Sequence, residues 1–166
     1  KKIGSYSFSN CSYLNKIEFE PNSQLVHIDN GAFYLCRFKK ISIPNCVEII
    51  GSNAFYMCLQ LTEADVSNCV NLNAINNHTF YKCSIKNFVI PRKVKSVGAH
   101  AFSNTSALYS IEFLGDSMSL GDHCFCNCNN LTIISLPNAE KIKSISSCFI
   151  NVSKDFVLFT IPKAMM

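Results

Sequence analysis

The most regular feature of the chain is a phenylalanine that returns every 22–25 residues. Each of these phenylalanines follows a small residue, and an aliphatic residue precedes it by four or five positions. A repeat of this length predicts a stack of similar units, each of which buries its apolar side chains against its neighbours. The recurring residues are Phe8, Phe33, Phe55, Phe80, Phe102, Phe125 and Phe149.

A second apolar pattern lies between the phenylalanines. It is first seen as Leu14, Ile17 and Phe19, whose last two members have the two-residue spacing of a strand. All five prolines follow such a pair, where a residue without an amide hydrogen ends a strand. The pattern predicts seven strands in one parallel sheet, joined by turns or short 3₁₀ segments. The strands are expected around Ile17, Ile41, Ala64, Phe88, Ile111, Ile134 and Phe159.

The segments that carry both patterns resemble one class of leucine-rich repeat. IGSNAFYMC at residues 50–58, IGSYSFSNC at 3–11 and VGAHAFSNT at 97–105, with the strands KKISIP and KNFVIP, resemble the BspA-like (treponemal-type) repeat. Ala64, Thr105 and Val152 depart from the pattern. The resemblance implies a leucine-rich-repeat solenoid, conventionally of the α/β horseshoe class but mostly β with short 3₁₀ turns, with about seven repeats. It also implies a curved domain of bacterial or protist surface proteins that bind host or matrix proteins, without catalytic residues.

Composition and charge narrow the function further. Hydrophobic residues make up 48% of the chain and charged residues 16%, which is enough apolar surface for a core. The net charge of +4 is not gathered in a basic run, so we expect no nucleic-acid partner. No apolar stretch approaches the roughly 18 residues of a membrane span, so we expect no direct membrane insertion by this segment. Residues 1–166 are expected to form one domain that is a fragment of a longer protein, with uncapped ends that favour self-association.

Cysteine and histidine are the candidates for metal or redox chemistry. The ten cysteines mostly occupy repeated apolar positions, such as Cys58 and Cys83 three residues after a phenylalanine, so we expect buried thiols. The motif at Cys124, Cys126 and Cys128 lacks the usual zinc spacing, and we assign no metal and no cofactor. His78, His100 and His123 share one repeat position and should form a row. Its alternatives are solvated loop residues or a metal-binding or pH-sensitive stripe.

Five N-x-S/T sequons are compatible with a secreted protein, without establishing one. They begin at Asn10, Asn77, Asn104, Asn130 and Asn151, which are therefore possible glycosylation sites.

The outward residues of the predicted strands are the candidates for ligand binding. They alternate with the apolar core positions and combine both charges with apolar side chains, which favours a protein partner on the concave sheet face. The expected function is a non-enzymatic binding module of a cell-surface or secreted adhesin or receptor-like protein. The alternative is a cytoplasmic scaffold for protein assembly. The candidate residues are Lys16, Glu18, Lys40, Ser42, Glu63, Asp65, Asn87, Val89, Ser110, Glu112, Ile133 and Ser135.

Overall fold

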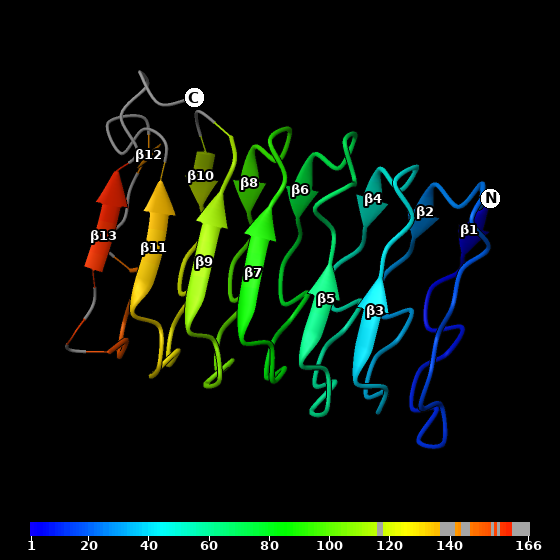
Figure 1. Cartoon of the computed structure of the whole chain (residues 1–166). Helices are drawn as coiled ribbons and strands as arrows, with labels where there is room; N and C mark the ends of the chain where they lie inside the picture. The colour runs from blue at the N-terminus through cyan, green and yellow to red at the C-terminus, as the bar shows by residue number, and fades with distance from the viewer. Residues whose placement is uncertain (116–117, 137–141, 144–146, 154, 156, 161–166) are drawn as a thin grey trace.

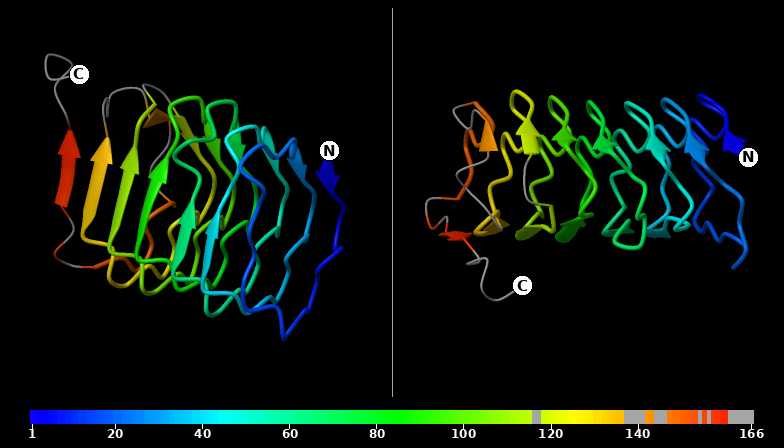
Figure 2. Two further views of the ribbon diagram at one scale, coloured as in Figure 1. Left: turned by 45° about the vertical axis from the view of Figure 1, so that its right-hand side comes forward. Right: turned by 90° about the horizontal axis from the view of Figure 1, so that it is seen from above.

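The chain winds into a solenoid whose turns stack side by side from the N-terminus to the C-terminus (Figure 1). The computed structural model describes residues 1–115, 118–136, 142–143, 147–153, 155 and 157–160. Each full turn adds one strand to a row of longer strands and one to a row of shorter strands behind it (Figure 2). All strand pairs are parallel, and no helix occurs in the described residues. The predicted solenoid is confirmed.

The longer strands lie where the apolar alternation predicts them. They are β3 (Lys40–Ser42), β5 (Glu63–Asp65), β7 (Asn87–Ile90), β9 (Ser110–Phe113), β11 (Ile133–Leu136) and β13 (Val157–Thr160). Six of the seven predicted strands are thus confirmed, and that around Ile17 is wrong because residues 14–20 form no strand. This first turn has a neighbour on one side only, and Ile17 is only half-buried there. Fewer pairing and packing contacts therefore hold it extended.

A second row of strands was not predicted, so the expectation of one sheet is wrong. These strands contain two or three residues, which is too short for a visible alternation, and most end on the aliphatic residue that precedes a phenylalanine. They are β1 (Lys2–Ile3), β2 (His27–Ile28), β4 (Ile49–Ile50), β6 (Ala74–Ile75), β8 (Ser96–Val97), β10 (Met118–Leu120) and β12 (Ile142–Lys143).

The phenylalanine segments are hydrogen-bonded turns that form a third, non-strand side of the solenoid, called here the turn side. No 3₁₀ helix occurs there among the described residues, so the turn alternative is correct. The amides of the first six of these phenylalanines donate to the next turn, as Phe55 does to Thr79 (3.0 Å) and Phe80 to Ala101 (2.8 Å). In each of the first six phenylalanine turns two residues have a positive φ, among them His78 (56°) and Lys82 (55°). Gly31 fills the same position as His78 two repeats earlier, with φ 61°.

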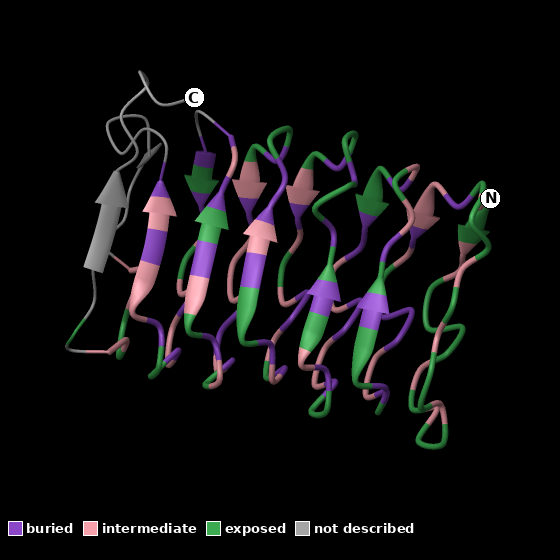
Figure 3. Cartoon of the chain, viewed as in Figure 1, coloured by how far each residue is buried: buried purple, intermediate pink, exposed green. Residues whose placement is uncertain are grey.

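The phenylalanines stack along the solenoid axis, and those from Phe33 to Phe125 belong to the buried core. Figure 3 shows that buried positions lie next to exposed or half-buried positions within the same longer strands. Neighbouring ring centroids lie 5.3–5.5 Å apart from Phe8 to Phe149. Phe55, Phe80 and Phe102 are fully buried, as predicted. Burial of one such ring contributes about 1.5–3 kcal/mol, so this stack is a main source of stability.

The cysteine column belongs to the same core. The thiol of Cys58 donates to the carbonyl of Phe33 (3.1 Å), and that of Cys83 donates to the carbonyl of Phe55 (3.2 Å). Thr105 makes the equivalent bond to Phe80 (2.9 Å), which explains why a hydroxyl replaces a thiol in that turn. No disulfide joins the cysteines, all of which lie in the described residues. Seven cysteines occupy repeated apolar positions, five of them three residues after a phenylalanine and two directly before one. The expectation of buried thiols is confirmed for six of these seven, whereas Cys11 in the first turn is half-buried.

Both strand rows are interrupted at the same level of the stack. No strand pairing joins β4 to β6 or β5 to β7, although the turn side continues unbroken from Phe55 to Phe80. In the next turn the amide of Gly98 bonds to the carbonyl of Ile75, but at the interruption the side-chain amide of Asn76 bonds to the carbonyl of Ile50 (2.7 Å). At this level a side chain therefore replaces a backbone donor. We call the level between β4 and β6 and between β5 and β7 the seam.

Candidate binding surface

The predicted binding residues mostly gather on the outward side of the longer strands, called here the long-strand face. Each strand directs alternate residues outward, as in β5, where Glu63 and Asp65 are exposed around buried Ala64. Ten of the twelve predicted residues belong to this face. They are Lys40, Ser42, Glu63, Asp65, Asn87, Val89, Ser110, Glu112, Ile133 and Ser135.

The remaining two predicted residues lie in the first turn, outside any strand. Lys16 and Glu18 are both exposed and form an ion pair with each other (2.8 Å). They border a depression of about 940 Å³ that also reaches β3. Because no strand fixes these side chains in register with Lys40 and Ser42, they lie beside the long-strand face and do not extend its regular rows.

Strand register brings outward side chains of neighbouring turns into direct contact. Lys40 lies opposite Glu63, and their ion pair measures 2.7 Å. Ser110 lies opposite Asn87 and donates to its side-chain oxygen (2.7 Å). Adjacent strands are about 4.8 Å apart, so these contacts form a regularly spaced array. The array is held by the backbone and is therefore suited to contact another surface.

Asp65 is the most strongly fixed carboxylate of the long-strand face. One of its oxygens accepts hydrogen bonds from the hydroxyl (2.6 Å) and the amide (2.9 Å) of Ser67, and the other accepts a longer bond from Ser42 (3.4 Å). The hydrogen bond from the Ser67 hydroxyl lowers the pKa of Asp65, against a smaller effect of burial. Asp65 is therefore a preorganised negative charge on this face.

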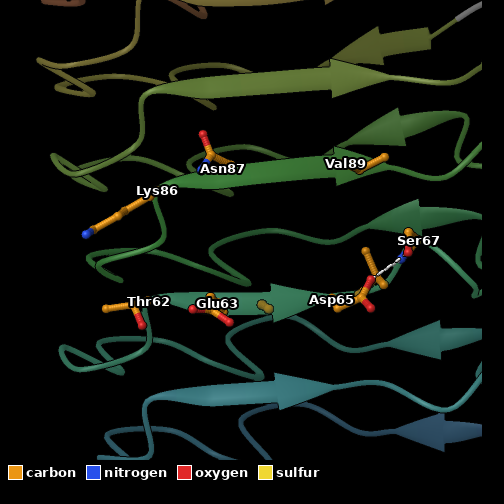
Figure 4. Close-up of a pocket in the computed structure, with 9 residues that line it drawn as sticks. Thr62, Glu63, Asp65, Ser67, Lys86, Asn87 and Val89 are labelled. Carbon is orange, nitrogen blue, oxygen red and sulfur yellow. Dashed lines mark hydrogen bonds between the residues drawn. The ribbon is translucent and has the colours of Figure 1, made fainter.

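A cavity of about 430 Å³ opens on the long-strand face at the seam, between β5 and β7 (Figure 4). Ala64 lines the cavity and occupies the inward position that the larger side chains of Ile41, Phe88 and Ile111 fill in other turns. The residues that line the cavity are Thr62, Glu63, Ala64, Asp65, Val66, Ser67, Lys86, Asn87 and Val89.

The sequence did not identify Thr62 and Lys86 as part of this site. Both directly precede a strand, so they lie outside the alternation that identified their neighbours. Ala64 was recognised as a departure from the repeat pattern. That departure was the sequence signal for a cavity at this turn.

The histidine row forms, but its rings are neither freely solvated nor arranged around a metal. The rings of His78 and His100 stack with centroids 5.0 Å apart, and those of His100 and His123 stack at 5.2 Å. The rings of Tyr56 and Tyr81 flank His78. Desolvation, followed by the proximity of His100, lowers the pKa of His78. Among the described residues, no group of three or more His, Cys, Asp or Glu side chains is placed to hold a metal ion.

The sequon asparagines differ in how far their side chains are used by the fold. Asn10, Asn77, Asn130 and Asn151 are exposed, and Asn104 is half-buried. The side-chain amide of Asn151 donates to Asn127 (2.9 Å), and that of Asn127 donates to Asn104 (3.2 Å). Glycosylation at these sites stays a prediction.

The parallel solenoid and the 22–25-residue period of its apolar positions define a leucine-rich repeat protein. The chain belongs to the family of BspA type leucine-rich repeat regions, whose six-copy model matches residues 1–77 and 73–165. The part of the chain that the structure describes holds no long apolar helix of the kind that crosses a bilayer.

Two solved structures are similar to this chain. One is a leucine-rich repeat protein from Bacteroides ovatus ATCC 8483, with 22% identity and a TM-score of 0.44 over 95% of this chain and 54% of that chain. The other is a leucine-rich cell surface protein from Faecalibacterium prausnitzii A2-165, with 25% identity and a TM-score of 0.49 over 85% of this chain and 40% of that chain. The chain thus spans about half or less of the length of these two proteins. No match is found among curated proteins.

Proposed function

We propose that this chain is a non-enzymatic protein-binding module, and that its long-strand face is the binding surface. The observation that carries the proposal is the pair of register-fixed arrays of outward side chains, one on β3 and β5 and one on β7, β9 and β11. Such an array is rigid before binding, so little conformational entropy is lost when a partner docks.

The chemistry of the face favours a protein as the partner. Lys40, Glu63, Asp65 and Glu112 supply charges of both signs, whereas Val89 and Ile133 supply half-buried apolar contacts. Protein interfaces combine apolar anchors with polar groups in this way. These strands carry one lysine and three carboxylates, whereas a surface that binds a polyanion needs an excess of positive charge.

We further propose that the module belongs to a cell-surface or secreted adhesin or receptor-like protein, with a host or matrix protein as the partner. This follows from what the BspA type of repeat implies. Protease treatment of intact source cells tests the location, because a surface protein is degraded before the cells are lysed. Full resistance of the protein on intact cells would contradict it.

Charge reversal on the long-strand face tests the binding surface. The double variant Glu63→Lys/Asp65→Lys and the wild type are compared by biolayer interferometry against a panel of purified matrix proteins. The matched control is Glu48→Lys, an exposed carboxylate beside β4 in the other strand row. We expect the double variant to lose at least tenfold in affinity for any protein that the wild type and the control bind.

The contrary result also has a structural meaning. Binding that persists in the double variant, but is lost on substitution of His78 and His100, would move the site to the turn side. Absence of binding by the wild type to every protein of the panel, in the presence of a correctly folded chain, would argue against a matrix partner.

A further inference from the structure

We propose that the cavity at the seam receives an arginine side chain of the partner protein. This inference rests on the proposed function and names the chemical group that the centre of the long-strand face recognises. The strands β5 and β7 lie on either side of this cavity.

One backbone hydrogen bond crosses the cavity, from the amide of Lys86 to the carbonyl of Thr62 (3.4 Å), and no strand pairing continues from it between β5 and β7. In β5, the backbones of Glu63 and Asp65 are directed toward the β3 side. The amide of Glu63 donates to the carbonyl of Lys39 (3.3 Å), and the carbonyl of Asp65 accepts from the amide of Ile43 (2.8 Å). Alternate residues of a parallel strand face opposite neighbours, so the backbone of Ala64 is directed toward β7. The backbones of Asn87 and Val89 are directed toward β5 for the same reason, because Ser110 and Leu114 of the next turn bond to Lys86 and Ile90.

These groups have a ligand-binding capacity that the other turns lack. No strand pairing joins β5 to β7, and the backbones of Ala64 and Asn87 border the cavity where that pairing would lie. The carboxylates of Glu63 and Asp65 line the same cavity. Carbonyl and carboxylate oxygens around one cavity can accept several hydrogen bonds at once. A planar group with many N–H donors can supply them.

A guanidinium group fits this set of acceptors better than an ammonium group. It carries five donors in a planar fork, is weakly hydrated and stays charged at all relevant pH values. The half-buried side chain of Val89 offers an apolar contact for the aliphatic stem, which long basic side chains bury while the charged head reaches polar groups.

The charges around the cavity favour a cation. Asp65 keeps acceptor capacity on the oxygen that receives only the long bond from Ser42. Lys86 is the one basic residue among the side chains that line the cavity, and Figure 4 shows its side chain extending away from Glu63 and Asp65. Glu63 already forms an ion pair with Lys40 (2.7 Å), so the negative charge that attracts an arginine from the partner is chiefly that of Asp65.

Binding of a small arginine analogue tests the inference directly. The probe is Nα-acetyl-L-arginine N-methylamide, titrated into ¹⁵N-labelled protein and followed by amide chemical shifts. Two control probes are titrated in the same way. Nα-acetyl-L-citrulline N-methylamide is neutral and nearly isosteric with the arginine probe, and Nα-acetyl-L-lysine N-methylamide carries an ammonium group. We expect saturable shifts confined to residues 62–67 and 86–89, with citrulline at least tenfold weaker and lysine weaker than arginine.

Two variants separate the cavity from general charge attraction. Ala64→Ile fills the cavity with the side chain that the same column carries at Ile41 and Ile111, and Asp65→Asn removes a charge without changing the shape. We expect each to weaken arginine binding at least tenfold. The control Glu48→Gln should bind as the wild type does. Dispersed amide spectra establish that each variant is folded, and Asp65→Asn remains informative even when Ala64→Ile does not fold.

Several results would overturn the inference. They are equal binding of citrulline, stronger binding of lysine, shifts spread over the whole face, or unchanged arginine binding in a folded Ala64→Ile variant. The Ala64→Ile variant could lose binding of the arginine analogue and still bind a protein partner as the wild type does. That result would show that the partner places no arginine in the cavity, and it would leave the proposed binding surface intact. Arginine binding without any protein partner would instead count against the proposed function alone.

Discussion

The turn side and the long-strand face of the solenoid use the same repeat in opposite ways. On the turn side, one residue type, phenylalanine, returns at the same position in every turn, and the backbone hydrogen bonds run past the seam without a gap. On the long-strand face, one outward position holds lysine, glutamate, asparagine, serine and isoleucine in successive turns, and the strand pairing is interrupted. The difference indicates that the turn side carries the stability and leaves the long-strand face free to vary.

The largest expected effect is on the turn side. Phe80→Ala removes a fully buried ring that stacks on Phe55 and Phe102, both at 5.3 Å. It should lower the free energy of unfolding by about 3–5 kcal/mol, because the transfer free energy is lost and a cavity remains. Urea denaturation measures this change.

The matched substitution on the long-strand face is Asn87→Ala, at an exposed position of the next strand. It should change the free energy of unfolding by no more than about 0.5 kcal/mol, as for most surface sites. Similar losses for the two variants would contradict the division between the two sides.

A smaller effect is expected in the cysteine column. Cys58→Ala removes the hydrogen bond to the carbonyl of Phe33 and leaves a small void, which should cost about 1–2 kcal/mol. Cys58→Thr should cost less, because Thr105 makes the same bond in another turn. Thermal unfolding of the two variants measures the difference, and a more stable alanine variant would show that the bond is unimportant.

The thiols of this column should also react slowly in the folded protein. Burial raises the pKa of Cys58 and of Cys128 to about 12, so few thiolates form at pH 8. A thiol reagent should modify the half-buried Cys11, Cys46 and Cys126 first and the buried cysteines only after denaturation. Mass spectrometry of partly modified protein identifies the order, and early labelling of Cys58 would contradict the burial.

The smallest effect concerns acid and the histidine row. The pKa of His78 is lowered in the folded state, so the unfolded chain binds this proton more tightly. Stability is therefore lost as the pH falls from neutral through the lowered pKa. The loss should be well under about 1 kcal/mol because the ring is partly exposed and solvent screens its charge.

The variant His78→Asn tests this effect. It keeps a residue type that accepts a positive φ, as Asn53 does at the equivalent position. The difference in melting temperature between pH 7.5 and pH 5.5 should be smaller in the variant than in the wild type. An equal difference would show that other groups determine the acid response.

The sequence predicted the parts of the fold that repeat with a readable period. The phenylalanine spacing and the strand alternation each return often enough to define the solenoid, six of the longer strands and most of the buried thiols. The shorter strands were missed because two residues cannot show an alternation, as at Ile49–Ile50. The strand at Ile17 was wrongly predicted because the pattern is local, whereas pairing depends on neighbours that the first turn lacks on one side.

The candidate site was predictable in its residues but not in its shape. The alternation of apolar and polar residues alone predicts that Glu63, Asp65 and Asn87 lie on one surface, and in the structure all three are exposed positions of β5 and β7. The seam depends on how two turns stack, which no local pattern encodes. Its sequence signals were single departures from the repeat, namely Ala64 in the strand and Asn76 where other turns carry glycine.

Native-state amide hydrogen exchange, resolved by NMR, tests most directly the claim that the turn side is continuous and the strand rows are interrupted. The amides of Phe55, Met57 and Phe80, which bond from turn to turn, should exchange only through global unfolding. The amides of Ala64 and Val89, which are directed across the seam, should exchange many times faster. Equal protection of the two sets would contradict the seam, and with it the cavity on the long-strand face.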